Sequence, residues 1–301
     1  MDQIETMSGI KNVLLVVNPV SGALDKANLI LQIELAVKKI DAHLNIFQTT
    51  GEEDLPNLCR RIKELKPCRI LIAGGDGTIK LTAEALKNES IPVGIIPAGS
   101  ANGLAANLGL SLNTETQIQT ALGNTFQKID IILINDEYCL HIADFGINAE
   151  LIGKYAESNI RGKLGYVLHS IPTLIESEYP FQFKIEANNQ IFNKEGILLA
   201  IANANSYGTG AKVNPKGKID DGFFEVLIFK HFDIIKILKT LRNEVDYDPE
   251  FMETIMTKEA KISCAAPVAF QIDGEYLGKK EFISAEILPN KLTIAIPGKK
   301  D

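Results

Sequence analysis

Residues 74–78, Gly-Gly-Asp-Gly-Thr, constrain the fold of this chain more than any other segment. They follow the apolar run 69–73, which predicts a buried strand, and they lead into residues 78–87, which predict a helix. Glycines at such a turn allow positive φ and a close approach of the backbone to a ligand. The first amides of the helix then lack partners in the chain and suit an anion, most naturally phosphate. Asp76 suits a metal ion or a hydroxyl better, which indicates a bound cation or a proton-transfer role.

Length and charge narrow the class of protein. A chain of 301 residues predicts about two domains. The net charge of -7 and the absence of a basic stripe argue against a nucleic-acid partner. The four cysteines lack CxxC spacing, so neither a zinc site nor a disulfide framework is predicted. Without a secretory signal or a membrane-length apolar run, we expect a cytoplasmic protein that can visit a membrane surface transiently.

Residues 10–128 alternate strand and helix patterns and predict an α/β domain. Strands are expected at 12–17, 44–48, 69–73 and 91–96, and helices at 26–40, 54–65, 78–87 and from about Gly103. Repeated βα units form a parallel sheet with helices on both faces. Ligands of such sheets bind beyond the carboxyl ends of the strands.

Three glycine-rich loops follow strands of this expected sheet, at residues 18–22, 74–78 and 97–103. Because the carboxyl ends of parallel strands share one edge, we expect the loops to converge on one site. Asn18 and Ser21 offer side-chain donors and acceptors there, and Gly22 frees the backbone beside them. Ser100 and Asn102 can in addition cap the helix that begins near Gly103.

Residues 129–301 change to short β-rich runs and predict an antiparallel β-sandwich, with the option that the last segment packs back on the first domain. Helices are expected among these strands at 165–176 and 232–241. The strands are expected at 129–133, 138–143, 181–186, 196–202, 223–229, 261–263, 268–272 and 292–296.

Taken together, the motifs resemble the catalytic domain shared by diacylglycerol kinases, sphingosine and ceramide kinases, and bacterial lipid kinases. The resemblance covers nearly the whole chain. It is carried by the three loops above and by residues 144–150, 161–166, 203–210, 220–222 and 271–275.

The resemblance implies a lipid kinase that uses ATP and Mg²⁺ to phosphorylate a hydroxyl of a diacylglycerol-like or sphingoid lipid. The implied nucleotide-binding residues are Asn18, Ser21, Gly22, Thr49, Gly74, Gly75, Asp76, Gly77, Thr78, Ser100 and Asn102. Ser100 stands where the bacterial enzymes usually have threonine, and it keeps the hydroxyl. Thr49 has a plainer alternative as a hydroxyl at the end of a strand.

Two aspartates compete for the role of general base. Asp273 matches the residue that acts in the bacterial lipid kinases, although an Asp-Gly pair is also typical of a tight turn. Asp76 is the rival, as base or as organiser of Mg²⁺. We assign Asp273 as the base, with Glu275 as a helper. We assign Asp76 to the binding of Mg-ATP, in which it contacts the Mg²⁺.

Two departures from the family pattern stand out. Lys80 and Leu81 replace the Asn-Glu pair that usually follows the 74–78 loop. Lys216 replaces an aspartate in the loop that binds a structural Mg²⁺ in bacterial members, so that metal is not predicted. The basic residues Lys154, Arg161 and Lys163 form either a solvated face or a contact for anionic lipid headgroups.

Two other functions fit the same motifs. NAD kinases resemble this chain in the 74–78 loop and in joining an α/β domain to a β-rich one. A lipid- or nucleotide-binding module without catalysis is the second, which the substitutions at Lys80, Leu81 and Lys216 make conceivable. The sequence leaves open which lipid is phosphorylated and whether the protein forms a homo-oligomer.

Overall fold

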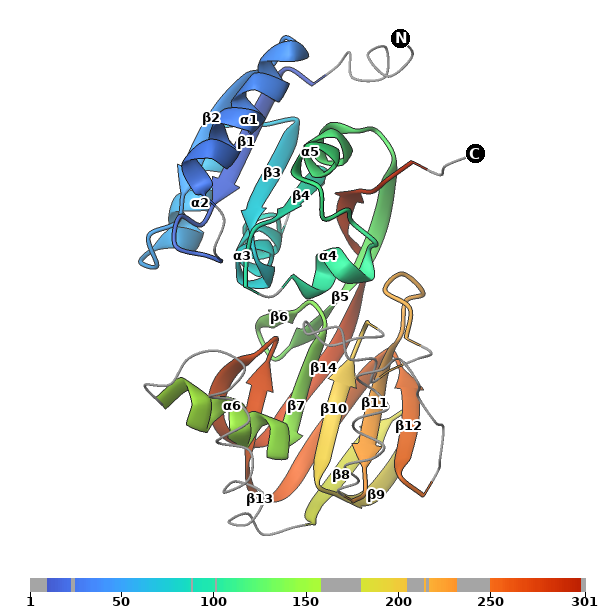
Figure 1. The fold of residues 1–301 in the computed structure, drawn as a ribbon. Helices are drawn as coiled ribbons and strands as arrows, with labels where there is room; N and C mark the ends of the chain where they lie inside the picture. Colours follow the sequence, from blue (N-terminus) through green and yellow to red (C-terminus); the bar gives the residue numbers. More distant parts are fainter. Residues whose placement is uncertain are drawn as a thin grey trace. The chain divides into compact units, whose positions relative to one another are not determined.

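In the computed structural model the chain forms two units, residues 1–129 with 290–301 and residues 130–289 (Figure 1). The structure describes residues 10–22, 25–87, 89–100, 102–157, 180–204, 214, 217–231 and 250–298. The chain passes between the units twice, within strands β5 and β14. No helix among these residues is both long and apolar enough to cross a membrane.

The first unit is built on a parallel sheet with the strand order β2-β1-β3-β4. At its β4 edge, Ile294 at the end of β14 pairs in parallel with Val93. The elements of the unit are β1 (Asn12–Val17), α1 (Lys26–Lys39), β2 (His43–Gln48), α2 (Asp54–Leu65), β3 (Arg69–Gly74), α3 (Asp76–Ala85), β4 (Val93–Pro97), α4 (Gly103–Asn107) and α5 (Thr114–Leu122).

Helices cover both faces of this sheet, because its strands are apolar on both sides. Val13, Leu15 and Val17 of β1 share a buried cluster with apolar residues of α1 and α5. Helices α2 and α3 pack on the other face, against β1 and β3. The predicted α/β domain with a parallel sheet is confirmed.

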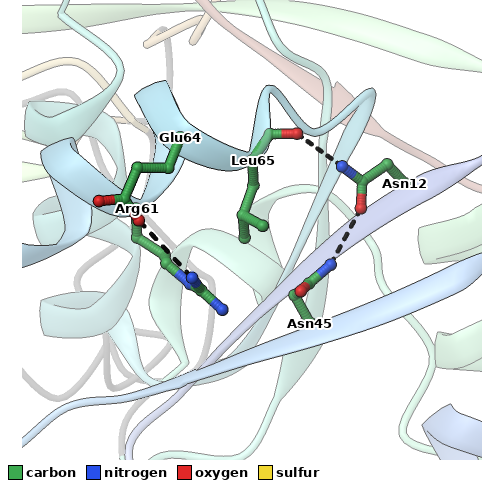
Figure 2. Close-up of polar contacts among 5 residues, drawn as sticks. All are labelled: Asn12, Asn45, Arg61, Glu64 and Leu65. Atoms are coloured by element: carbon green, nitrogen blue, oxygen red, sulfur yellow. Dashed lines mark hydrogen bonds and ion pairs between the residues drawn. The ribbon is translucent and has the colours of Figure 1, made fainter.

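Asn12 secures the end of β1 away from the glycine-rich loops. Figure 2 shows its side chain donating to the carbonyl oxygen of Leu65 at the end of α2, at 2.6 Å, and accepting from Asn45 of β2, at 2.9 Å. The nearby pair of Arg61 and Glu64 is exposed and 3.6 Å long, so it stabilises little. At the amino ends of the strands, polar side chains thus link β1 to α2 and to β2. The glycine-rich loops lie at the carboxyl ends of the strands.

The second unit consists of antiparallel strands and, among the described residues, one helix. Its strands β12, β11, β10, β7, β13 and β14 pair in that order, β8 and β9 extend from β13, and β5 with β6 extends from β14. Its elements are β5 (Phe126–Ile134), β6 (Glu137–Cys139), β7 (Ile142–Gly146), α6 (Ile147–Glu157), β8 (Phe181–Ala187), β9 (Gln190–Gly196), β10 (Leu198–Ala202), β11 (Phe224–Phe229), β12 (Met252–Thr257), β13 (Glu259–Ile272) and β14 (Glu275–Ala295).

Strand β13 belongs to both layers of this unit. Its first half pairs with β8 and its last residues pair with β7, with register irregularities between Ser263 and Val268 and again before Gln271. Such irregularities bend a strand. The two halves enclose one apolar core that includes Phe145, Phe183 and Phe270. The predicted β-sandwich is confirmed.

Several predicted boundaries were wrong. The strand expected at 138–143 is two strands, β6 and β7, separated by Leu140 and His141. The strands expected at 261–263 and 268–272 are one, and the strand expected at 196–202 begins only at Leu198, after β9 has ended at Gly196. The helices expected at 165–176 and 232–241 lie outside the described residues.

Candidate active site

The three glycine-rich loops of the first unit lie side by side at the carboxyl ends of β1, β3 and β4. The amide of Asn18 donates to the carbonyl of Ala73 at the end of β3, at 3.2 Å. The amide of Ala98 donates to the carbonyl of Gly74, at 2.9 Å. The Ser21 hydroxyl lies 3.2 Å from the carbonyl oxygen of Ala98, to which it donates. The structure therefore brings together the loops that the sequence predicts to converge.

Backbone geometry explains two of the glycines. Gly22 has a φ of +60°, and a Cβ there would lie 2.6 Å from the carbonyl oxygen of Ala98. A Cβ on Gly74 would lie 2.3 Å from the Thr78 hydroxyl. Neither position accepts a side chain without moving a loop.

Helix α3 begins inside the Gly-Gly-Asp-Gly-Thr loop, at Asp76, two residues earlier than predicted. Its N-cap residue, Gly75, has no side chain to cap the first amides. Gly77 is exposed, and open space lies where its Cβ would stand. An uncapped helix start beside open space fits a phosphate group.

Asp76 holds the third loop. Its carboxylate accepts hydrogen bonds from the amides of Gly103 and Leu104, at 2.8 and 3.2 Å. These are the first amides of α4, so Asp76 caps that helix from another loop.

The expectation that Ser100 or Asn102 caps α4 is wrong. Asn102 occupies the N-cap position, but its side chain instead exchanges two hydrogen bonds of 3.0 Å with the backbone of Gly99. Ser100 is exposed on the same loop. The Asp76 carboxylate takes the amides that a local cap would have used.

Thr49 follows β2, next to the loop after β1. Its amide donates to the carbonyl of Val17 at 3.0 Å, which continues the β1–β2 pairing by one residue. The side chain is half-buried at the carboxyl edge of the sheet.

Sequence reasoning missed Lys26, which begins α1. Its ammonium donates to the carbonyl oxygens of Ser21 and Ala98, each at 2.7 Å. Burial lowers the pKa of this amine below its usual value. One signal was available in the sequence, because a lysine in the first turn of a helix opposes the helix dipole and needs another reason to be there.

Asp273 lies in the second unit, in a two-residue turn between β13 and β14. Asp273 and Gly274 both have positive φ, +49° and +89°, and Ile272 pairs with Glu275 across them. This is the turn type that favours Asp-Gly. Glu275 is the first residue of β14 and is exposed.

The Asp273 carboxylate also binds a distant segment. It accepts hydrogen bonds from the amides of Leu140, His141 and Ile142, at 2.7, 2.9 and 3.2 Å. Amides turned toward this carboxylate are unavailable to a neighbouring strand, which explains why the expected strand at 138–143 breaks there.

Buried polar side chains hold the turn at Asp273 and Gly274 through hydrogen bonds. Gln271 accepts from the amide of Gly274 at 2.7 Å and donates to Asp144 at 2.5 Å. Asn148, at the start of α6, donates to the same Asp144 oxygen at 2.6 Å. Gln271 and Asp144 are almost fully buried. These three residues position Asp273, and the sequence offered only their place within the motif segments.

The nucleotide and the Mg²⁺ that the resemblance implies need different binding groups. The loops of the first unit, with glycine, backbone amides and a buried lysine, fit a nucleotide phosphate. Within the described residues, no place gathers three or more His, Cys, Asp or Glu side chains, as a dedicated all-protein metal site would. Asp76 alone suits a Mg²⁺ that is held mainly by phosphate oxygens.

The remaining sequence expectations lie outside the described residues. These are the Lys216 position of the structural metal loop, the side chain of Lys154, and Arg161 and Lys163.

Comparisons with known proteins agree with this arrangement. Residues 12–134 match the family model described as the diacylglycerol kinase catalytic domain. Residues 142–296 match the YegS C-terminal NAD kinase beta sandwich-like domain.

Named relatives cover most of the chain. A probable lipid kinase YegS-like of Chromohalobacter salexigens is 28% identical over 270 residues, 87% of this chain and 86% of that protein. A probable lipid kinase YegS of Escherichia fergusonii is 26% identical over 268 residues, 86% of this chain and 87% of that protein. The crystal structure of a diacylglycerol kinase from Bacillus anthracis shares the fold, with a TM-score of 0.76, 20% identity and coverage of 96% of this chain and 98% of that one.

Proposed function

Because the chain belongs to the YegS-like lipid kinase family with a diacylglycerol kinase catalytic domain, we propose that it transfers the γ-phosphate of ATP to a hydroxyl of a diacylglycerol-like or sphingoid lipid. The observation that carries this proposal is the meeting of three glycine-rich loops at the carboxyl ends of β1, β3 and β4. They offer backbone amides and a fixed cation to a polyphosphate.

In the proposed reaction the first unit holds the phosphate donor. The first-turn amides of α3 and the loop after β1 bind the phosphates, and Ser100 and Asn102 line the third loop. Asp76 keeps that loop in place through α4 and is the proposed protein contact for Mg²⁺. When bound, Mg-ATP would supply the phosphoryl group, and its Mg²⁺ would neutralise the negative charge that develops during transfer.

The second unit supplies the base. Oδ1 of Asp273 accepts from the amides of His141 and Ile142 and from the Cys139 thiol, whereas Oδ2 accepts from the Leu140 amide alone within the described residues. The second lone pair of Oδ2 is therefore the proposed acceptor for the proton of the lipid hydroxyl. The bonds of Gln271 to Gly274 and Asp144 keep this carboxylate in one orientation. Glu275 follows directly and assists in the proposal. The enzyme meets its lipid by transient contact with the cytoplasmic membrane surface.

The test is incubation of the purified protein with γ-labelled ATP, Mg²⁺ and a total lipid extract, with NAD supplied in a parallel reaction. The proposal expects the label in an organic-phase lipid, which mass spectrometry then identifies. Label in NADP instead would replace the proposal by a NAD kinase. No transfer to either acceptor, with ATP still bound, would indicate a binding module.

A further inference from the structure

Lys26 joins two of the three loops through one ammonium group. The residue is 9% exposed, although lysine is rarely buried without a partner. Its two acceptors come from different loops, Ser21 from the loop after β1 and Ala98 from the loop after β4. Both distances are 2.7 Å, at the lower end of the usual range for charge-assisted hydrogen bonds.

The charge of this lysine has no anionic partner in the described part of the chain. No carboxylate of these residues lies within ion-pairing distance of its ammonium. The adjacent Asp25 uses its side chain to accept from the amides of Ala27 and Asn28. The first turn of α1 contains no acidic residue, and the helix dipole places positive charge at the same end.

A buried cation in this position is costly unless an anion balances it. Carbonyl oxygens solvate an ammonium but carry no net charge. The lowered pKa of the Lys26 amine has this cause, since burial disfavours its charged form. An anion at the loops would reverse that effect.

The surroundings of the Ala98 carbonyl oxygen are tightly packed. That oxygen accepts from both Lys26 and the Ser21 hydroxyl, and a Cβ on Gly22 would lie 2.6 Å from it. The two loops therefore have little freedom to shift while the ammonium is in place.

We infer that Lys26 is a positioning residue of the nucleotide site, whose ammonium fixes the loops at 18–22 and 97–103 and whose charge balances a bound polyphosphate. The inference rests on the proposed function, because it names a further residue of the same site. Lys26 therefore makes two contributions to the site, the hydrogen bonds to two carbonyl oxygens and the positive charge.

The test compares Lys26→Gln and Lys26→Met with the matched control Lys39→Met, an exposed lysine of the same helix. Glutamine keeps N–H donors and removes the charge, and methionine removes both. Isothermal titration with ADP, adenosine and inorganic tripolyphosphate measures each affinity, and thermal unfolding checks the fold.

We expect Lys26→Gln to bind ADP and tripolyphosphate at least about tenfold more weakly, because a charge-assisted interaction is lost. Adenosine affinity should stay within about twofold, since adenosine carries no phosphate, and Lys39→Met should match the wild type. Lys26→Met should show at least the same loss, so either variant carries the test if the other does not fold.

Equal losses for ADP and adenosine would reduce Lys26 to a structural lysine and overturn the inference. So would ADP affinity in Lys26→Gln within twofold of the control. In both cases wild-type ADP binding leaves the proposed function standing. A wild-type protein that binds neither ATP nor ADP would instead remove the proposed function, and the inference with it.

Discussion

The two units each place an aspartate in a glycine turn and use its carboxylate to hold a second segment. Asp76 in the first unit binds two amides at the start of α4. Asp273 in the second unit binds the two amides between β6 and β7 and the first amide of β7. The two aspartates differ in the side chains that support their turns. The Asp273 turn is held by hydrogen bonds among the side chains of Gln271, Asp144 and Asn148.

A structural hydrogen bond does not exclude a chemical role for either aspartate. Amide donors leave a carboxylate with unused acceptor sites and fix its direction. We assign the aspartate with the buried support to proton transfer, since a base must be held in one orientation. We assign the other aspartate to the organisation of the loop that is proposed to bind the nucleotide.

The largest effect should come from Asp273→Asn. We expect transfer to lipid to fall by about 10²–10⁴-fold, because a general base is removed. ADP affinity should remain that of the wild type, because the proposed nucleotide-binding residues lie in the first unit. Steady-state kinetics and calorimetry measure the two quantities. Retained turnover would remove Asp273 from the mechanism and undo the comparison.

The second effect should come from Asp76→Ala, which removes the cap of α4. Mg-ADP affinity should fall by about tenfold or more. Unfolding free energy should fall by about 0.5–2 kcal/mol, the usual cost of losing a cap. Asn113→Ala is the matched control, because Asn113 caps α5 through the amide of Thr116. A control that weakens nucleotide binding equally would show that only stability had changed.

A smaller effect should come from Gln271→Met, which keeps the side-chain length and removes both hydrogen bonds. We expect kcat to fall by about tenfold with unchanged ADP affinity, since the turn loses its orientation. Stability should fall by about 1–3 kcal/mol, because the Gly274 amide and the Asp144 carboxylate lose a partner. The control is Gln182→Met, an exposed glutamine of β8. Wild-type kcat in a folded Gln271→Met would make the buried support irrelevant to catalysis.

The smallest effect should come from the Ser100 hydroxyl. Ser100→Ala should weaken ADP binding by about 3- to 10-fold, the range of one neutral hydrogen bond, while Ser100→Thr should stay within about twofold. Titration calorimetry distinguishes them. Equal affinities for alanine and serine would exclude this hydroxyl from the nucleotide site.

The sequence predicted the fold class of both units, because the strands of the first unit are continuous apolar runs and the loops follow their ends. Strand 12–17 and helix 54–65 were predicted with the observed bounds. Strand β14 was largely missed, since many of its residues are exposed and only its last part is apolar.

Local patterns failed where distant contacts decide the structure. The break between β6 and β7 depends on Asp273, more than 130 residues further along the chain. The cap of α4 comes from Asp76, 27 and 28 residues before its amides. Lys26 was missed for the same reason, because one of its acceptors, Ala98, is 72 residues away. Periodicity and local turn chemistry carry no information on such pairs.

The most direct test of the account is single-turnover transfer from γ-labelled ATP to the identified lipid, with Asp76→Ala and Asp273→Asn measured over rising ATP concentration. If Asp76 serves nucleotide binding and Asp273 serves proton transfer, saturating ATP should restore most of the transfer by Asp76→Ala and none of that by Asp273→Asn. Transfer at the wild-type rate by Asp273→Asn, with Asp76→Ala inactive even at saturation, would contradict the account.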